Sequence, residues 1–205
     1  MYIRINKYLN SNVDASPLIV FRIFFGLLML ISILRFWNNG WIETIYIEPI
    51  FHFKYYGFEW VRSFKEWNYL LFLICAISTL CITIGYKYKF FSVLFFLTFT
   101  YIELIDKTTY LNHYYFISII SFFLIFLPAN CKFSLDAYLQ KKECNEIPIW
   151  TIDVIKIMLF IVYFYAGIAK INSDWLLKAM PLSIWLPGKY DLLLVYDVNN
   201  NPMIE

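Results

Sequence analysis

PLIVFRIFFGLLMLISILRFW, residues 17–37, is an apolar run that matches the roughly 20 residues a helix needs to cross a bilayer. Its length, and the lack of a cleavage site of small residues, indicate a retained membrane helix rather than a removed signal peptide. Arg22 interrupts the run about one turn in, where it can either reach the headgroups or pair inside a helical bundle. We favour a structural interpretation of Arg22 and expect a cytoplasmic amino-terminal segment over residues 1–17.

The composition places the whole chain in the same class as this run. Hydrophobic residues make up 61% of the 205 residues, and the mean hydropathy is +0.61. Soluble domains have about 45–50% apolar residues. The chain is therefore predicted to be a polytopic membrane protein with one domain, residues 18–186, and the bilayer as its partner. The net charge of +2 suggests no nucleic-acid partner.

Four further apolar runs predict an all-α bundle of about five transmembrane helices. The turn Tyr86–Lys89 is too short to cross anything, so the helices on either side of it form an antiparallel hairpin. A short surface helix is expected in FSLDAYLQKKE, residues 133–143. The further apolar runs are Asn68–Tyr86, Phe90–Ile105, Tyr114–Leu127 and Trp150–Ala169.

The connection Asn38–Trp67 is too charged to span a membrane and is rich in tryptophan and tyrosine. Such amphipathic rings favour the headgroup level, so we expect an aromatic interfacial loop that covers one end of the bundle. His52 lies in this loop. A lone histidine among aromatic residues is more often packed than catalytic, and we interpret it as packed.

The four cysteines do not form a metal-site pattern, and we predict no metal. Cys75 and Cys81 lie in an apolar run, where they are expected to pack as small hydrophobes. Cys131 and Cys144 share one loop. A disulfide between them requires that the loop face an oxidising compartment, and we favour free thiols.

Five spans place the amino terminus, the 87–89 turn and the 129–148 loop on one side of the membrane. Lysine and arginine are somewhat denser in the short loops of this side, which favours a cytoplasmic amino terminus. The segment Asp106–His113 and the residues Lys170 and Asp174 then lie on the outer face, together with the aromatic loop.

IVYFYAGIAKINSDW, residues 161–175, is an apolar helix that reaches Lys170 at its end. The lysine either extends its ammonium to the headgroups or, buried in apolar surroundings, becomes a neutral base. Asp174 lies one turn further on. It can pair with Lys170 if the helix continues, and that ion pair would hold the lysine protonated.

A second polar cluster follows the third apolar run. Glu103, Asp106 and Lys107 are spaced i, i+3 and i+4, so we expect them to share one helix face. Asn112 is predicted to cap the next helix, which leaves His113 at the mouth of the bundle. A histidine and a lysine that converge there suit general-base chemistry.

Four blocks of the sequence resemble the vitamin K-dependent gamma-carboxylases and their bacterial relatives built on the horizontally transferred transmembrane (HTTM) domain. Together they cover most of residues 22–186. The blocks are FRIFFGLLML (21–30), WIETIYIEPIFHFKYYGFEWV (41–61), DKTTYLNHYYF (106–116) and IVYFYAGIAKINSDWL (161–176).

The resemblance implies a carbon–carbon lyase that couples quinol epoxidation to carboxylation of glutamate. The cofactor would be reduced vitamin K or a menaquinone-type quinol, with O2 and CO2 as co-substrates and a glutamate-containing protein or peptide as acceptor. Lys170 falls on the base that deprotonates the quinol, and His113 on the residue that supports carboxylation. Positioning of the substrates falls to Asn112, Asp106, Lys107, Asp174 and Arg22.

Two departures from the family accompany this resemblance. Ala169 precedes Lys170 where well-known members have two adjacent lysines, and the segment 187–205 stands where members continue into further spans and a large domain. We expect the HTTM portion of a longer protein, or a truncated product, in a bacterial inner membrane. The alternative function is a non-catalytic binding or assembly module that keeps the pocket.

Overall fold

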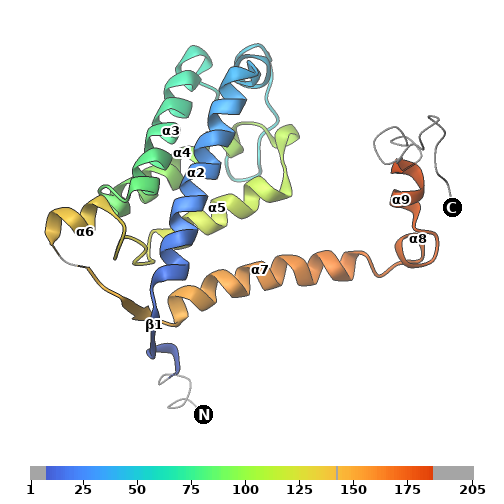
Figure 1. Cartoon of the computed structure of the whole chain (residues 1–205). Coiled ribbons are helices and arrows are strands. Elements are labelled where there is room, and N and C mark those ends of the chain that lie inside the picture. The colour runs from blue at the N-terminus through green and yellow to red at the C-terminus, as the bar shows by residue number, and fades with distance from the viewer. Residues whose placement is uncertain (1–7, 142, 187–205) are drawn as a thin grey trace, which may run out of the picture. The chain divides into compact units, whose positions relative to one another are not determined.

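The computed structural model describes residues 8–141 and 143–186. It divides into two units, Met1–Ile155 and Lys156–Glu205, which are described separately below. Eight α-helices are described: α2 (Ser16–Asn38), α3 (Asn68–Ile84), α4 (Tyr88–Ile105), α5 (Asn112–Leu124), α6 (Leu135–Gln140), α7 (Trp150–Ala169), α8 (Ser173–Leu176) and α9 (Met180–Trp185) (Figure 1). Shorter elements are the π-helical turn Glu43–Ile47, the 3-10 turns Lys65–Trp67 and Lys107–Thr109, and the strands β1 (Asn12–Asp14) and β2 (Glu146–Pro148).

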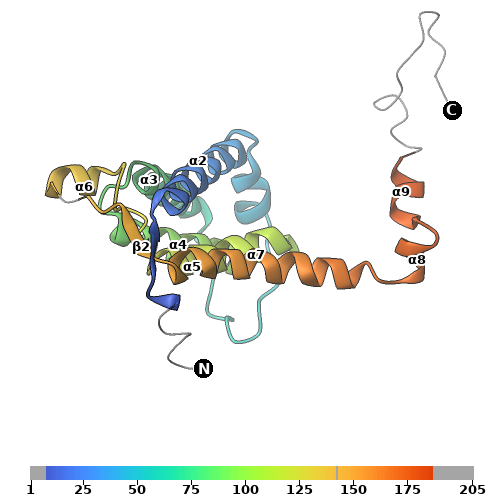
Figure 2. The ribbon, with the colours of Figure 1, turned by 60° about the horizontal axis from the view of Figure 1, so that its bottom comes forward.

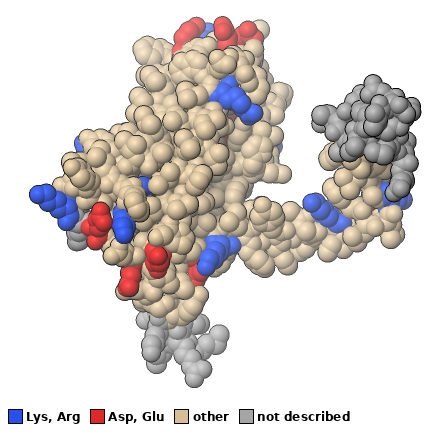
Figure 3. Space-filling view, viewed as in Figure 1, with Lys and Arg blue, Asp and Glu red and all other residues tan. Residues whose placement is uncertain are grey.

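The predicted all-α membrane bundle is confirmed. In the described part of the chain, 4 helices are long and apolar enough to cross a membrane: Ser16–Asn38, Lys65–Ile84, Tyr88–Ile105 and Trp150–Ala169. Large apolar side chains of α2, α3 and α4 are exposed, among them Phe24, Leu28 and Phe90. One face of the molecule is almost free of charge between the two ends of the bundle (Figure 3). Such a surface fits lipid rather than water.

The first unit is a bundle in which each helix packs on the next along the chain: α2 on α3, α3 on α4, and α4 on α5 (Figure 2). Gly26 lets α2 approach α3 closely, because a Cβ there would overlap the Thr83 hydroxyl and come within 3.0 Å of the Thr79 carbonyl oxygen. Small residues serve this purpose in membrane helix pairs. The fully buried Phe95 stacks edge-on against Phe25, with ring centroids 5.8 Å apart.

The predicted hairpin between α3 and α4 is confirmed. Gly85 caps α3 in the left-handed conformation, with φ of 68°, and α4 begins three residues later at Tyr88. Asp136 of α6 then accepts hydrogen bonds from the backbone amides of Lys87 and Tyr88, at 2.7 and 2.9 Å. A carboxylate at these free amides stabilises the start of α4. The predicted surface helix, α6, thus stabilises the turn between α3 and α4.

The helix α5 is shorter than the predicted span Tyr114–Leu127. It has 13 residues, or about 20 Å at 1.5 Å per residue, against the roughly 30 Å of a hydrocarbon core. It nevertheless returns the chain to the end where α4 begins, because the Tyr88 hydroxyl donates to the Leu124 carbonyl at 2.7 Å. The antiparallel order of the first four helices is therefore the order that the sequence predicts.

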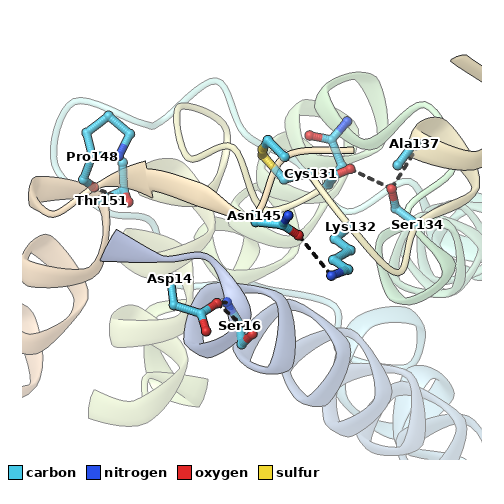
Figure 4. Close-up of a disulfide and its surroundings, with 11 residues drawn as sticks. Asp14, Ser16, Cys131, Lys132, Ser134, Ala137, Asn145, Pro148 and Thr151 are labelled. Carbon is cyan, nitrogen blue, oxygen red and sulfur yellow. Dashed lines mark hydrogen bonds between the residues drawn. A yellow bond between two sulfur atoms is a disulfide. The ribbon is translucent and has the colours of Figure 1, made fainter. Parts of the chain in front are cut away.

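The preference for free thiols at Cys131 and Cys144 is wrong, because the two form a disulfide with Cα atoms 5.1 Å apart (Figure 4). The antiparallel pairing of β1 with β2, which was not predicted, lies beside it and holds Val13 opposite Ile147. The strand pairing fastens the 129–148 loop to the segment before α2, and the disulfide closes the loop on itself. Cys75 and Cys81 are free and buried, as predicted.

The second unit contains the rest of α7, then α8 and α9. The segment 187–205, predicted to be a truncated carboxyl-terminal part, and most of the charged residues at the amino terminus lie outside the described residues.

Candidate functional site

The end of α4 provides the polar centre of the first unit. The helix stops at Ile105, and Asp106 is extended, with φ of −140° and ψ of 121°. The prediction that Glu103, Asp106 and Lys107 share one helix face is therefore wrong, because the chain leaves the helix before the last two. Asp106 instead begins a 3-10 turn and accepts hydrogen bonds from the amide and hydroxyl of Thr108, at 2.9 and 2.8 Å.

His52 is the partner of the other carboxylate oxygen of Asp106. Its Nδ1 lies 3.0 Å from Asp106 Oδ2, and both side chains are more than nine-tenths buried. The interpretation of His52 as packed is confirmed by its burial, and the ring in addition makes a hydrogen bond to a carboxylate that the sequence did not predict. A carboxylate that holds one imidazole nitrogen fixes the orientation of the ring.

The aromatic loop is held against this end of the bundle by three further contacts. The amide of Lys107 donates to the Phe53 carbonyl at 2.8 Å, and the Lys54 ammonium donates to the Ile105 carbonyl at 3.2 Å. The Tyr101 hydroxyl donates to the Arg62 carbonyl at 2.9 Å. The expectation that this loop covers one end of the bundle is confirmed by these contacts.

The pKa of Asp106 reflects two opposing effects. Burial by itself raises the pKa, but the hydrogen bonds from Thr108 and His52 favour the charged carboxylate more strongly, so the net pKa lies below its ordinary value. Asp106 is therefore an anion at neutral pH and acts as an acceptor. It is positioned to orient His52 rather than to donate a proton.

Beside this pair lies an open pocket of about 330 Å³, which we call the aromatic pocket. Its walls are mostly rings and apolar side chains, with two threonines as the polar contribution. A space of this size, mostly apolar with a few polar groups, is typical of small-molecule sites. The lining residues are Phe36, Trp41, Ile45, Tyr46, Thr108, Thr109, Tyr110, Leu111 and Tyr114.

Asn112 and His113 follow directly on this wall, at the start of α5. Asn112 is the first helical residue, and Leu111 occupies the cap position without a side-chain hydrogen bond, so the predicted cap by Asn112 is wrong. Leu111 is extended, with φ of −129° and ψ of 132°. His113 is exposed and its ring lies against that of Tyr114, with centroids 4.5 Å apart.

Arg22 lies at the opposite end of α4 from Asp106. It is fully buried and donates to the Phe133 carbonyl at 2.5 Å, beside the turn at Gly85. The structural interpretation of Arg22 fits this place. Among residues 8–141 and 143–155, no contact brings Arg22 together with Asp106, Lys107, Asn112 or His113.

Lys170 and Asp174 belong to the second unit. The helix α7 ends at Ala169, and Asn172 caps α8 by accepting from the Trp175 amide at 2.9 Å. Asp174 pairs with Lys178 at 3.1 Å, so it does not hold Lys170. The Lys170 ammonium instead lies 5.1 Å from the centroid of the Trp175 ring. The helix break that a neutral lysine requires is present.

A comparison with protein families adds to this geometry. A family model described as the HTTM domain matches residues 10–204. The chain belongs to the HTTM domain family. The HTTM match runs through the aromatic loop, the Asp106–His113 segment and Lys170, and so includes both units. No solved structure matches the chain.

The HTTM domain has one polar pair that reasoning from the sequence missed. His52 and Asp106 are 54 residues apart, and no spacing rule connects them. A signal was available, since His52 lies inside the second sequence block and Asp106 opens the third. An imidazole and a carboxylate in adjacent family blocks can form a hydrogen bond, and this is a reason to expect contact between them.

Proposed function

We propose that this HTTM domain is a membrane enzyme domain of the vitamin K-dependent carboxylase type. It would bind a quinol, reduced vitamin K or a menaquinone-type quinol, and couple its oxygenation to carboxylation of a glutamate-containing protein or peptide. When bound, the quinol supplies the energy that a glutamate C–H bond, a very weak acid, requires for deprotonation. The aromatic pocket beside the Asp106–His113 segment is the observation that carries the proposal.

The pocket suits a planar, hydroxylated ring. Ring faces of Trp41 and Tyr110 can stack on such a headgroup. The hydroxyls of Thr108 and Thr109 donate hydrogen bonds to Asp106, so their oxygens can accept from a quinol hydroxyl. The His52–Asp106 pair holds the same turn in place. Asp106 and Lys107 thus position the pocket wall through this turn, and Asn112 and His113 lie at the start of α5, which follows it.

Lys170 is proposed as the base that takes the first proton from the quinol. Only a neutral amine can do this, and Asp174 does not oppose it because that carboxylate is paired with Lys178. The helix that leads to Lys170, α7, is long and apolar enough to cross a membrane. His113 would then support the later carboxylation step.

The test uses membranes that contain the full-length protein, reduced naphthoquinol, oxygen and labelled bicarbonate with a glutamate peptide. Epoxide and carboxylated peptide are measured by chromatography and mass spectrometry. Lys170→Ala should abolish epoxide formation, and an external amine should restore part of it with a pH dependence set by the pKa of the amine. Lys89→Ala removes an exposed lysine at the start of α4, the end of the bundle opposite the aromatic pocket, and should leave activity unchanged. Full activity of Lys170→Ala without amine refutes the role.

The site is proposed to lie on the outer face of a bacterial inner membrane, as the lysine and arginine distribution favours. The disulfide between Cys131 and Cys144 argues for the opposite orientation, because disulfides persist in oxidising compartments and this one lies at the amino-terminal end of the bundle.

A further inference from the structure

Glu103 is a carboxylic acid that the proposed reaction does not use. It lies in the last turn of α4, a helix apolar enough to cross a membrane. No hydrogen bond or ion pair involves its carboxylate within residues 8–141 and 143–186. An ionisable residue inside a membrane bundle costs free energy, and one that lacks a partner indicates a function rather than a contribution to stability.

The side chain of Glu103 lines a small cavity of about 30 Å³ between α2, α3, α4 and the start of α5. Most of the wall is apolar, from residues such as Met29, Phe72 and Ile102. A cavity of this size holds a water molecule or the edge of a ligand, but not a ring. The carboxyl group therefore faces a space that a polar ligand atom can enter.

This cavity and the aromatic pocket share three wall residues: Phe36, Tyr46 and Tyr114. The two spaces are thus neighbours, separated by three aromatic side chains. Burial raises the pKa of the Tyr46 phenol, with the Glu103 carboxylate adding to the rise, so this hydroxyl remains a neutral donor. A ring in the aromatic pocket would point one substituent toward the Tyr46–Glu103 side.

We propose that Glu103 is the inner polar contact of the ligand ring in the aromatic pocket, and that its carboxyl group hydrogen-bonds an oxygen substituent of that ring. The inference rests on the proposed function, because it takes a quinol or quinone as the ligand. A quinol hydroxyl donates to the carboxyl oxygen, and a quinone carbonyl accepts from the protonated acid. Glu103 is a binding and positioning residue, not the proposed base.

The experiment measures binding rather than turnover, so it does not depend on the proposed chemistry. The full-length protein in lipid nanodiscs is titrated with menadione, a naphthoquinone without an isoprenoid tail, and quenching of tryptophan fluorescence is followed. Empty nanodiscs correct for partitioning into lipid. The Trp41→Phe variant identifies the part of the signal that comes from the aromatic pocket, because Trp41 lines it.

Glu103→Leu keeps the approximate volume but removes the hydrogen bond, and should weaken menadione binding roughly tenfold. Glu103→Gln keeps a donor and an acceptor and should bind within about threefold of the wild type. Glu43→Gln, an exposed carboxylate in the nearby π-helical turn, is the matched control and should change nothing. The midpoint of thermal unfolding of Glu103→Leu should be no lower than that of the wild type.

Three results would overturn the inference, and they are distinguishable. If the wild type binds and Glu103→Leu binds equally well, Glu103 has no role while the proposed function stands. If binding and thermal stability of Glu103→Leu fall together and Glu103→Gln does not restore binding, the role is structural. If the wild type does not bind menadione above the nanodisc background, the quinol site itself is wrong and the inference fails with it.

Discussion

The pairing of His52 with Asp106 predicts a measurable change in how firmly the aromatic loop is held. Asp106→Asn keeps one oxygen for the two hydrogen bonds from Thr108 but removes the charge that His52 meets at 3.0 Å. A hydrogen bond to a charged group contributes about 1.5–3 kcal/mol. Local opening of the loop should therefore rise roughly 10- to 100-fold.

Trypsin can report this opening, because Lys54 lies inside the loop and its ammonium is bound to the Ile105 carbonyl. In nanodiscs, both faces of the protein are accessible to the protease. The rate of cleavage after Lys54, identified by mass spectrometry, follows the population of the open loop when closing is faster than cleavage. Asp106→Asn should raise that rate roughly 10- to 100-fold.

A double-mutant cycle isolates the pair. In a His52→Phe background, Asp106→Asn should add little, because the partner is already absent. Asp174→Asn is the matched control: it removes a carboxylate that is ion-paired but 61% exposed, and exposed pairs contribute at most about 1 kcal/mol. Equal cleavage rates for wild type and Asp106→Asn, or fully additive effects of the two substitutions, would refute the reasoning.

The same carboxylate gives a pH dependence of known sign. The pKa of Asp106 is lowered in the folded protein, so its stabilisation is present above the unfolded pKa of about 3.9 and is lost as the pH falls through the lower, folded pKa. Thermal unfolding followed from pH 6 down to pH 2.5 should show this loss in the wild type. The Asp106→Asn protein should lack that component, and identical profiles would contradict the assignment.

Three further predictions concern the bundle. Gly85→Ala should lower the free energy of unfolding by about 2–5 kcal/mol, since φ is positive there and a Cβ would meet Arg22 and Ser134. Gly57→Ala, at positive φ in open space, should lower it by about 1–2 kcal/mol. Equal unfolding midpoints of the two variants in detergent would contradict this. Cys144→Ser opens a disulfide with a sequence separation of 13 and should destabilise by about 3 kcal/mol in the oxidised protein only, so an effect that persists under reductant fails the prediction. Cysteines placed singly at positions 112 and 142 of a cysteine-free variant should label from opposite faces, and labelling from one face would refute the topology.

Much of the bundle follows from sequence because apolar run length sets helix length in a membrane. The predicted run Trp150–Ala169 has the same ends as α7. The run from Phe90 differs from α4 by two residues, of which the first, Tyr88, donates its backbone amide to Asp136. The predicted end of α5 at Leu127 was too late. Pro128 disfavours helix before it, and Ile125 to Leu127 form tighter turns instead.

The polar contacts could not be predicted in the same way. Whether His52 reaches Asp106 depends on the path of an irregular loop, and hydrophobic pattern carries no information about that path. The same holds for Cys131 and Cys144, whose pairing depends on how the loop folds back. For Lys170, the sequence left two outcomes: an ion pair with Asp174 if the helix continues, or no such pair if the helix breaks near Asn172. The helix breaks, because Asn172 caps a new helix.

The orientation of the bundle decides what kind of acceptor the proposed enzyme can serve. The disulfide and β1 lie at the end where α2 begins, and the His52–Asp106 pair and the aromatic pocket lie at the end where α4 stops, so these two ends face opposite sides in either orientation. A quinol moves within the bilayer and can enter from it whichever way the chain inserts. A protein substrate cannot. If the disulfide end faces the oxidising side, the pocket faces the cytoplasm and its acceptor is a cytoplasmic polypeptide. If the amino terminus is cytoplasmic, as the lysine and arginine distribution favours, the pocket faces outward and the acceptor is an exported polypeptide. In that orientation Cys131 and Cys144 remain reduced in the cell.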